Sequence, residues 1–269
     1  VDSLLSFNIR SLNHIEALQQ KELSFTLGSV IKKSANEQFN LQILPISTQI
    51  EYTSNTPYQT NNGLMLPLAG FQSILSAGFY AKLGILTLQL YPTLYHGLNR
   101  DFDGFPESFN DNIWRTRYSW WNHMDLPERY GSGTINQLDW GQSQLALSYK
   151  AFTLALSNQN IWWGPGKNNA LILSNNAAGF KHFTFKSNRP VNIFIGHLEW
   201  ELIGGILENS MYSPPFPTAR YSFNPFFNTS KNSDARYMNG ISISYHPKWV
   251  PGLFLGINGI VQKYSQIAV

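Results

Sequence analysis

The residues best suited to chemistry in this sequence are tryptophans that lie close to amides. Trp162 and Trp163 begin a segment that ends with Asn175 and Asn176. Flat aromatic rings stack on the C–H faces of sugars, and planar amides form paired hydrogen bonds with neighbouring hydroxyls. The segment therefore suits sugar binding. It also suits a purely architectural role, because its Gly-Pro-Gly sequence at 164–166 can form a sharp turn and paired tryptophans can anchor a membrane interface.

A second group combines aromatic rings with cations: Trp114, Arg115, Arg117, Trp120 and Trp121. Arginine attracts carboxylates and also stacks on aromatic faces, so this group suits an anionic polysaccharide. The alternative is a loop that packs on itself. The sequence leaves both interpretations open.

Arg129 and Trp140 belong to a third group, together with Glu128 and Asp139. These residues could contact sugar, or they could form an ion-pair network. A charged residue at membrane depth must face inward and be paired, and this requirement favours the network.

The sequence contains no recognisable catalytic or metal-binding motif. The six histidines are dispersed without the spacing of metal ligands, and there are no cysteines. Asp101 and Asp103 resemble the start of a calcium loop, but the closing glutamate is missing. Glu199 and Glu201 flank Trp200, yet residues two apart on one strand lie only about 7 Å apart, and no environment for a general acid can be argued. We therefore expect no enzymatic activity, no cofactor and no metal.

The elements that must position these residues are short segments in which apolar and polar residues alternate. This alternation puts successive side chains on opposite faces of a strand and predicts an all-β, antiparallel protein. The segments lie at 38–44, 46–52, 75–83, 86–91, 144–150, 152–157, 241–246 and 253–257. Aromatic residues such as Tyr149, Phe152 and Trp249 stand near the strand ends, which is typical of the aromatic girdles of membrane barrels.

Composition points in the same direction. Charged residues make up 13% and aromatic residues 14% of the 269 residues. A soluble domain carries about 25% charged residues, so the low charge and many aromatics favour a transmembrane β-barrel, although a soluble β-sandwich has an overlapping composition. The net charge of +3 is scattered, so nucleic acid is not an expected partner.

Residues 1–21 have apolar side chains at helical spacing and predict a short N-terminal helical segment at the periplasmic mouth of the barrel. Residues 22–269 are then the barrel. Two long polar, aromatic-rich stretches, near 96–136 and 209–234, predict long extracellular loops.

Several segments resemble the Wzi family of capsule-assembly proteins. WWGPG at 162–166 and LILSNNA at 171–177 are similar to the family signature, and we call residues 161–177 the signature segment. YQTNNG at 58–63, LPERYG at 126–131, DWGQS at 139–143 and PKWVPGL at 247–253 agree in order. Several collinear matches of this length are far more specific than one short motif.

The resemblance implies an outer-membrane barrel of about 18 antiparallel strands, within the range of such barrels, with a small helical element. It also implies a lectin-like role in which capsular or other exported polysaccharide is held at the cell surface. Outer-membrane lipid, lipopolysaccharide and other outer-membrane proteins are the further partners expected. The candidate contacts are Trp114, Arg115, Arg117, Trp120, Trp121, Arg129, Trp140, Trp162, Trp163, Asn175 and Asn176.

Two further expectations follow. The polar strand faces alone would also suit a diffusion channel or transporter, which is the alternative function. The predicted strands are too few to close a barrel of the family's size, and unpaired edges are not tolerated in lipid. We therefore expect the sequence to be part of a longer protein.

Overall fold

The computed structural model describes residues 9–11, 31–33, 39–59, 61–166, 168–212 and 232–265. The strands and the helix are β1 (Ile9–Ser11), β2 (Ile31–Lys33), β3 (Phe39–Thr53), β4 (Gly70–Leu83), β5 (Leu86–Leu90), β6 (Thr93–Gly97), α2 (Asp111–Met124), β7 (Ile135–Asp139), β8 (Gln144–Tyr149), β9 (Phe152–Ser157), β10 (Ile161–Trp163), β11 (His182–Ser187), β12 (Val191–Ile193), β13 (Gly196–Leu207), β14 (Arg236–Pro247) and β15 (Leu255–Tyr264).

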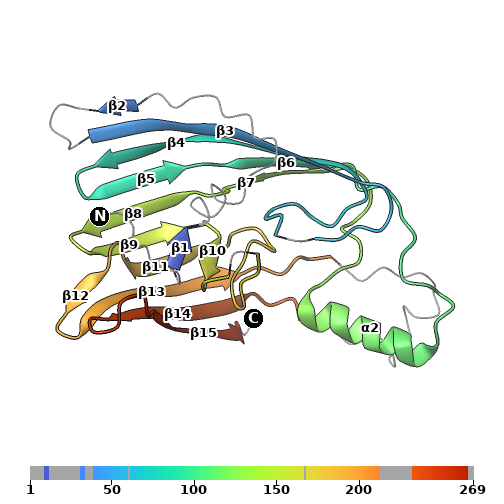
Figure 1. The fold of residues 1–269 in the computed structure, drawn as a ribbon. Helices are drawn as coiled ribbons and strands as arrows, with labels where there is room; N and C mark the ends of the chain where they lie inside the picture. The colour runs from blue at the N-terminus through green and yellow to red at the C-terminus, as the bar shows by residue number, and fades with distance from the viewer. Residues whose placement is uncertain are drawn as a thin grey trace.

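Thirteen of the strands form one antiparallel sheet (Figure 1). Its main order is β15-β14-β13-β11-β9-β8-β5-β4-β3-β2, and β6 and β7 extend the ladder beside β4. The all-β, antiparallel prediction is therefore confirmed. The two predicted segments at 38–44 and 46–52 form the single strand β3, whose register shifts between Leu44 and Ser47. Pro45, which has no N–H to donate to the ladder, lies in this irregularity.

The connections differ in length at the two ends of the sheet (Figure 1). At one end, which we call the turn end, short connections join β4 to β5, β8 to β9, β11 through β12 to β13, and β14 to β15. At the other, the loop end, the connections are long and span residues 54–69, 98–134, 158–181 and 208–235. The strands therefore hold these four long segments at one end of the sheet.

The two faces of the sheet have an inverted pattern of burial. Strand β9 shows it residue by residue: Leu154 is 53% exposed and Leu156 49%, whereas Thr153 and Ser157, which flank them, are only 4% and 5% exposed. Strands β11 and β14 repeat it, with Phe183 and Ile241 exposed and Thr184 and Ser242 buried. Apolar side chains therefore cover the outer face, and small polar side chains dominate the inner face.

A second, two-stranded sheet packs against the inner face. Strand β1 pairs with β10, and Ile161 and Trp163 of β10 pack on Ile203 of β13 and Met238 of β14. Residues 1–21 were predicted to be helical, but the described part of this segment, Ile9–Ser11, is an extended strand. The rest of the predicted helix lies outside the described residues.

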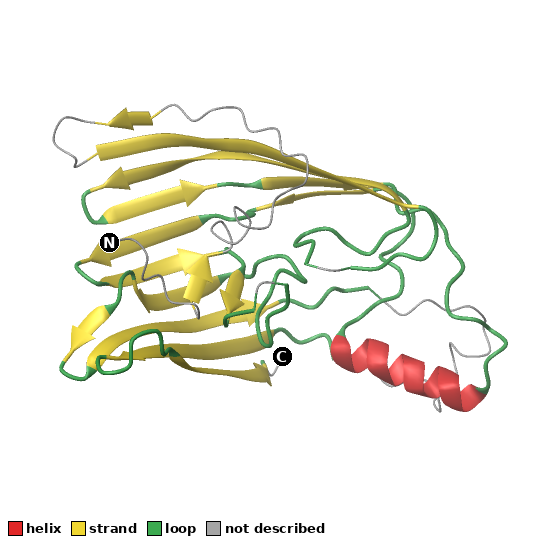
Figure 2. Ribbon diagram, viewed as in Figure 1, coloured by secondary structure: helices red, strands yellow, loops and turns green. Residues whose placement is uncertain are grey.

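The predicted loop at 96–136 contains a helix, which lies beyond the loop end of the sheet (Figure 2). The side chain of Asn110 caps the N-terminus of α2 by accepting a hydrogen bond from Ile113 N. Asp125, at φ 52°, ends the helix, and its carboxylate accepts hydrogen bonds from Ser210 N at 2.7 Å and Ser210 Oγ at 2.5 Å. The helix is thus tied to the connection after β13.

Within the described residues the sheet is open, because β2 and β15 stand at its two edges and do not pair with each other. A closed barrel of about 18 strands therefore stays a prediction. The helical part of the described chain contains no segment long and apolar enough to span a membrane.

Candidate functional site

Trp120 and the half-buried Arg117 of α2 line a groove at the loop end. The groove has a volume of about 390 Å³ and is lined by Phe105, Asn112, Ile113, Thr116, Arg117 and Trp120. Five of these residues belong to α2 and recur at the spacing of one helix face. Trp120 is 55% exposed. A flat ring and a guanidinium therefore share an open surface, which is the combination that an acidic sugar requires.

The neighbouring face of α2 is buried. Trp114, Tyr118 and Trp121 pack on one another and on Phe105, with ring centroids 5.0 to 6.2 Å apart. The predicted aromatic cluster is thus divided: Trp114 and Trp121 form the core of the loop, whereas Trp120 faces outward. The groove side of α2 and its buried side meet at Arg117.

The guanidinium of Arg117 stacks on two aromatic rings, Phe105 and Trp121. Its Cζ atom is 5.1 Å from the centre of the Phe105 ring and 4.9 Å from that of Trp121. Stacking on two rings holds the guanidinium in place and leaves its charge at the groove. Arg115 is exposed on the same helix. Arg115 does not line the groove, because residues two positions apart project from different sides of a helix.

Arg129 and Glu128 bind the start of the same long connection. Arg129 forms an ion pair of 3.3 Å with Asp101, donates to the Phe102 carbonyl and stacks on the Phe102 ring at 4.4 Å. Glu128 Oε1 accepts a hydrogen bond of 2.5 Å from Phe105 N. The pair therefore has the structural role that the sequence favoured, and it positions Phe105 in the groove. Burial raises the pKa of the neighbouring Tyr130 to about 12.

Trp140 and Asp139 do not join that network. Asp139 Oδ1 accepts hydrogen bonds from Gly141 N at 2.6 Å and Asn158 Nδ2 at 3.3 Å. The Trp140 side chain lies exposed, at the junction of β7 and β8, away from Arg129. The structure thus separates residues that the sequence had grouped.

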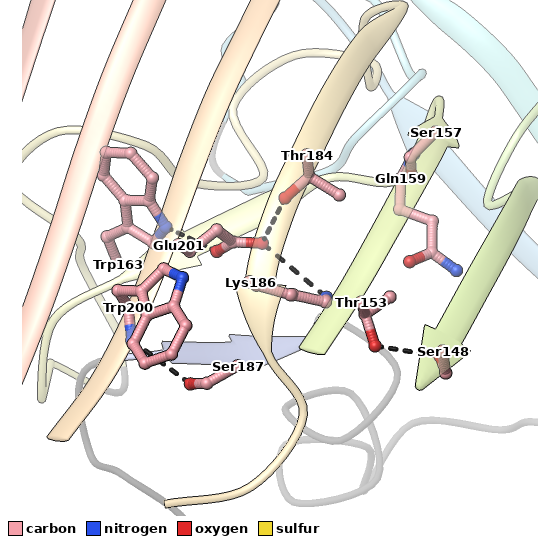
Figure 3. Close-up of polar contacts among 10 residues, drawn as sticks. All are labelled: Ser148, Thr153, Ser157, Gln159, Trp163, Thr184, Lys186, Ser187, Trp200 and Glu201. Carbon is pink, nitrogen blue, oxygen red and sulfur yellow. Dashed lines mark hydrogen bonds and ion pairs between the residues drawn. The ribbon is translucent and has the colours of Figure 1, made fainter. Parts of the chain in front are cut away.

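Trp162 and Trp163 are both only 1% exposed. Trp162 Nε1 donates to the Gly166 carbonyl at 2.8 Å, which closes the Gly-Pro-Gly turn. Trp163 Nε1 donates to Glu201 Oε2 at 2.8 Å (Figure 3). The two rings are therefore placed for architecture, as one of the two sequence interpretations proposed, and neither presents an open face.

Glu201 is the centre of a buried polar network that sequence reasoning did not foresee. Its second oxygen, Oε1, accepts a hydrogen bond of 3.2 Å from Thr184 Oγ1 and lies 3.6 Å from Lys186 Nζ (Figure 3). The carboxylate thus joins β10, β11 and β13. The sequence signal for this network was the alternation in β11. His182, Thr184 and Lys186 share one face of the strand, and Phe183 and Phe185 share the other. Nothing in the sequence pairs that face with Trp163.

Asn175 and Asn176 connect the signature segment to the first long loop. Asn175 Nδ2 donates to the Asn61 carbonyl at 2.8 Å, and Asn176 Oδ1 accepts from Asn61 N at 2.7 Å. Asn61 Nδ2 donates to the Asn168 carbonyl at 2.7 Å, and Gly63 N donates to the Asn175 carbonyl at 2.7 Å. These four bonds, which we call the asparagine clasp, join two motifs more than 100 residues apart.

His197 and His246 stack near the turn end, with ring centroids 5.6 Å apart, and line a small cavity with Glu199. No cluster of three potential metal ligands occurs in the part of the chain that the structure describes. This cavity lies at the opposite end of the sheet from the α2 groove.

Comparisons with curated proteins and with solved structures return no match. A family model does match: it is described as capsule assembly protein Wzi and covers residues 52–229, well over half of the chain. The matched region contains the asparagine clasp, helix α2 and the signature segment. The chain therefore belongs to the family of the capsule assembly protein Wzi.

Proposed function

We propose that this chain is an outer-membrane β-barrel protein that holds exported capsular polysaccharide at the cell surface and does not catalyse a reaction on it. Family membership supplies the link to capsule assembly. The location in a membrane is proposed from the inverted burial of the sheet. A water-soluble sheet buries its apolar face, whereas a membrane barrel turns that face outward to lipid.

The extent of the outer apolar surface supports this assignment. Exposed leucines, isoleucines and phenylalanines continue over neighbouring strands from β4 to β15. Continuous apolar surface of this size is rare on soluble monomers and marks a membrane or protein contact. Exposed aromatic rings stand near both ends: Tyr149 and Trp249 at the turn end, and Tyr52 and Tyr237 at the loop end. A membrane barrel is expected to carry one girdle of aromatic residues at each of the two interfaces of the bilayer.

The unequal lengths of the connections at the two ends predict the orientation of the barrel in the membrane. Outer-membrane barrels have short periplasmic turns and long extracellular loops. In this assignment the loop end, with α2 and the asparagine clasp, faces the exterior, where exported polysaccharide is found. The turn end faces the periplasm.

The α2 groove is the proposed polysaccharide contact. Trp120 supplies an open ring for stacking, and Arg117 supplies charge for the carboxylates or other anionic groups of the polymer. The buried Trp114, Tyr118 and Trp121 make the helix a rigid support for these residues. A rigid surface binds with a smaller loss of conformational entropy than a free loop.

The test is retention of the cell's own capsular polysaccharide by the purified full-length protein in detergent. Wild-type protein is expected to retain the polymer, and Trp120→Ala is expected to bind at least about tenfold more weakly, since exposed interface tryptophans are frequent hot spots. Trp249→Ala, which removes an equally exposed ring at the turn end, is the matched control and should bind normally. A failure of wild-type protein to retain the polymer would refute the proposal.

A diffusion channel is the second candidate, because the inner face is polar. The sheet formed by β1 and β10 packs on that face, however, and does not favour an open pore. Conductance in planar bilayers combined with no retention of polysaccharide would replace the proposal with the channel.

A further inference from the structure

The turn end carries an unusual distribution of charge. Within the described residues this end has four short connections, and three of them contain one cation each: Lys150 between β8 and β9, Arg189 between β11 and β12, and Lys248 between β14 and β15. None of the four contains an acidic residue. The acidic residues of the long connections, such as Asp101, Glu128 and Glu208, lie at the loop end, where charge is mixed. The described connections of the turn end are therefore positive, and those of the loop end carry both signs.

The three cations are available for a ligand. Lys150, Arg189 and Lys248 are all exposed, and within the described residues none of them forms an ion pair. We call these three residues the basic rim. Cations without an ion-pair partner repel one another weakly and attract an anionic ligand.

Hydrogen bonds between neighbouring connections hold the basic rim in place. Asn188 N donates to the Ala151 carbonyl at 3.0 Å, and Asn188 Nδ2 donates to the Lys150 carbonyl at 3.2 Å. Lys248 N donates to the Ile195 carbonyl at 3.0 Å. The connections therefore form one continuous edge, along which the cations are fixed by the order of the strands.

Each cation has an exposed aromatic residue in or beside the same connection. Tyr149 is next to Lys150, whose Nζ lies 5.3 Å from the centre of that ring, and Trp249 follows Lys248. Phe194, which is 91% exposed, lies in the connection that contains Arg189. Aromatic rings and basic side chains together are typical of the level of lipid headgroups, where the ring enters the interface and the cation reaches a phosphate.

We infer that the basic rim binds the phosphate groups of anionic glycerophospholipids in the bilayer leaflet that faces the turn end. The inference rests on the proposed membrane location but is independent of polysaccharide binding. Charge complementarity and the paired aromatics carry it. An anionic phospholipid offers phosphates at one height along a bilayer surface, which matches cations distributed along one edge of a sheet.

The experiment uses the full-length protein reconstituted in phosphatidylcholine bilayer discs. Fluorescent phosphatidylglycerol, or lipid A in a parallel series, is added, and its enrichment at the protein is measured by energy transfer from tryptophan. The rim variant combines Lys150→Asn, Arg189→Gln and Lys248→Gln. Asparagine is used at residue 150 because it tolerates the φ of 54° found there. The control variant removes the same charge at the loop end through Lys181→Gln, Arg236→Gln and Lys263→Gln.

Wild-type protein and the control variant should enrich phosphatidylglycerol over phosphatidylcholine. The rim variant should show a preference at least about tenfold weaker, because each cation near an anionic surface contributes a factor of about five to binding. Added salt should weaken the preference in the first two proteins only. Equal enrichment by the rim variant would overturn the inference, as would a stronger preference for lipid A that depends on the same three residues. Failure of wild-type protein to insert into any bilayer, seen as no change of gel mobility on heating, would overturn the membrane proposal as well, and so the two failures are distinguishable.

Discussion

A single buried carboxylate fixes the signature segment to the wall of the sheet. Burying a charge without partners is costly, and Glu201 meets this cost with three partners from two other strands: Trp163, Thr184 and Lys186. Lys186 lies at the longest distance, 3.6 Å, so the tryptophan N–H makes the closest of these contacts. Loss of one partner leaves a charged oxygen unsatisfied inside the protein.

Trp163→Phe should therefore destabilise the protein by about 1–3 kcal/mol, which is the usual cost of an unsatisfied buried group. Trp162→Phe is the control, because it removes a hydrogen bond to a neutral carbonyl and should cost about 1 kcal/mol. Denaturant unfolding in detergent, followed by the heat-dependent shift in gel mobility, measures both. Equal loss of unfolding free energy in the two variants would contradict the claim that the charge of Glu201 makes its hydrogen bond to Trp163 more stabilising than the bond of Trp162.

The tryptophans show what the sequence predicts and what it does not at the level of residues. Their chemical type suggested sugar contact for six of the eight tryptophans, and each candidate group also had a structural alternative. Exposure separates them: Trp120 is open, whereas Trp162 and Trp163 are enclosed. The enclosure of Trp163 depends on Ile203 of β13 and Met238 of β14, which lie 40 and 75 residues further along the chain, and packing over such a separation is not encoded in local spacing.

Helix α2 and the asparagine clasp are the elements that organise the loop end. The helix begins at a good capping residue, Asn110, and its buried residues recur at positions 114, 118 and 121. A cap and a helical period were thus present in the sequence. They were obscured because Trp120 and Arg117 interrupt the apolar stripe, and these two residues are the ones that line the groove.

Trp121→Ala should unfold the α2 region, with a cost of about 3–5 kcal/mol for a buried tryptophan, whereas Trp120→Ala should change stability by less than about 0.5 kcal/mol. The neighbouring positions make a sharp comparison, since both remove the same side chain from the same helix. Hydrogen exchange of residues 111–124 measures the difference. Similar protection in the two variants would contradict the division of the helix into a buried side and an exposed side.

Asn175→Ala should loosen the signature segment from the first long loop, because it removes the hydrogen bond to the Asn61 carbonyl. The expected loss is about 1 kcal/mol, visible as faster limited proteolysis between residues 166 and 177. Asn169→Ala changes an exposed asparagine in the same loop, for which the described residues record no side-chain hydrogen bond, and should leave the cleavage rate unchanged. Equal rates in both variants would mean that the clasp does not hold the loop.

At the scale of the whole molecule, the strands were the most predictable feature. Alternation located β3, β4, β8, β9, β14 and β15 because a residue's face follows directly from its parity along a strand. The direction of the faces was not predictable in this way, since a soluble sandwich and a membrane barrel alternate alike. The structure adds the exposure of each face, and that exposure supports the barrel.

Leu154→Arg tests which solvent the outer face meets. Leu154 and Leu171 are both exposed, at 53% and 102%, but one lies in the middle of β9 and the other in a loop. In lipid, arginine at mid-strand costs about 2–4 kcal/mol, so Leu154→Arg should lower the folding yield in lipid vesicles, while Leu171→Arg should not. If water surrounded both residues, the two substitutions would leave the folding yield equally unchanged, and that result would contradict the barrel.

The most direct measurement of the central claim is the division of capsular polysaccharide between cells and medium. Cells that lack this protein are complemented with wild-type protein or with Trp120→Ala, and the cell-bound and released polymer are quantified separately. A surface protein that holds polysaccharide through the α2 groove predicts that Trp120→Ala moves polymer from the cells to the medium while the total stays constant. A fall in the total, or an unchanged division despite normal levels of the variant in the outer membrane, would contradict it.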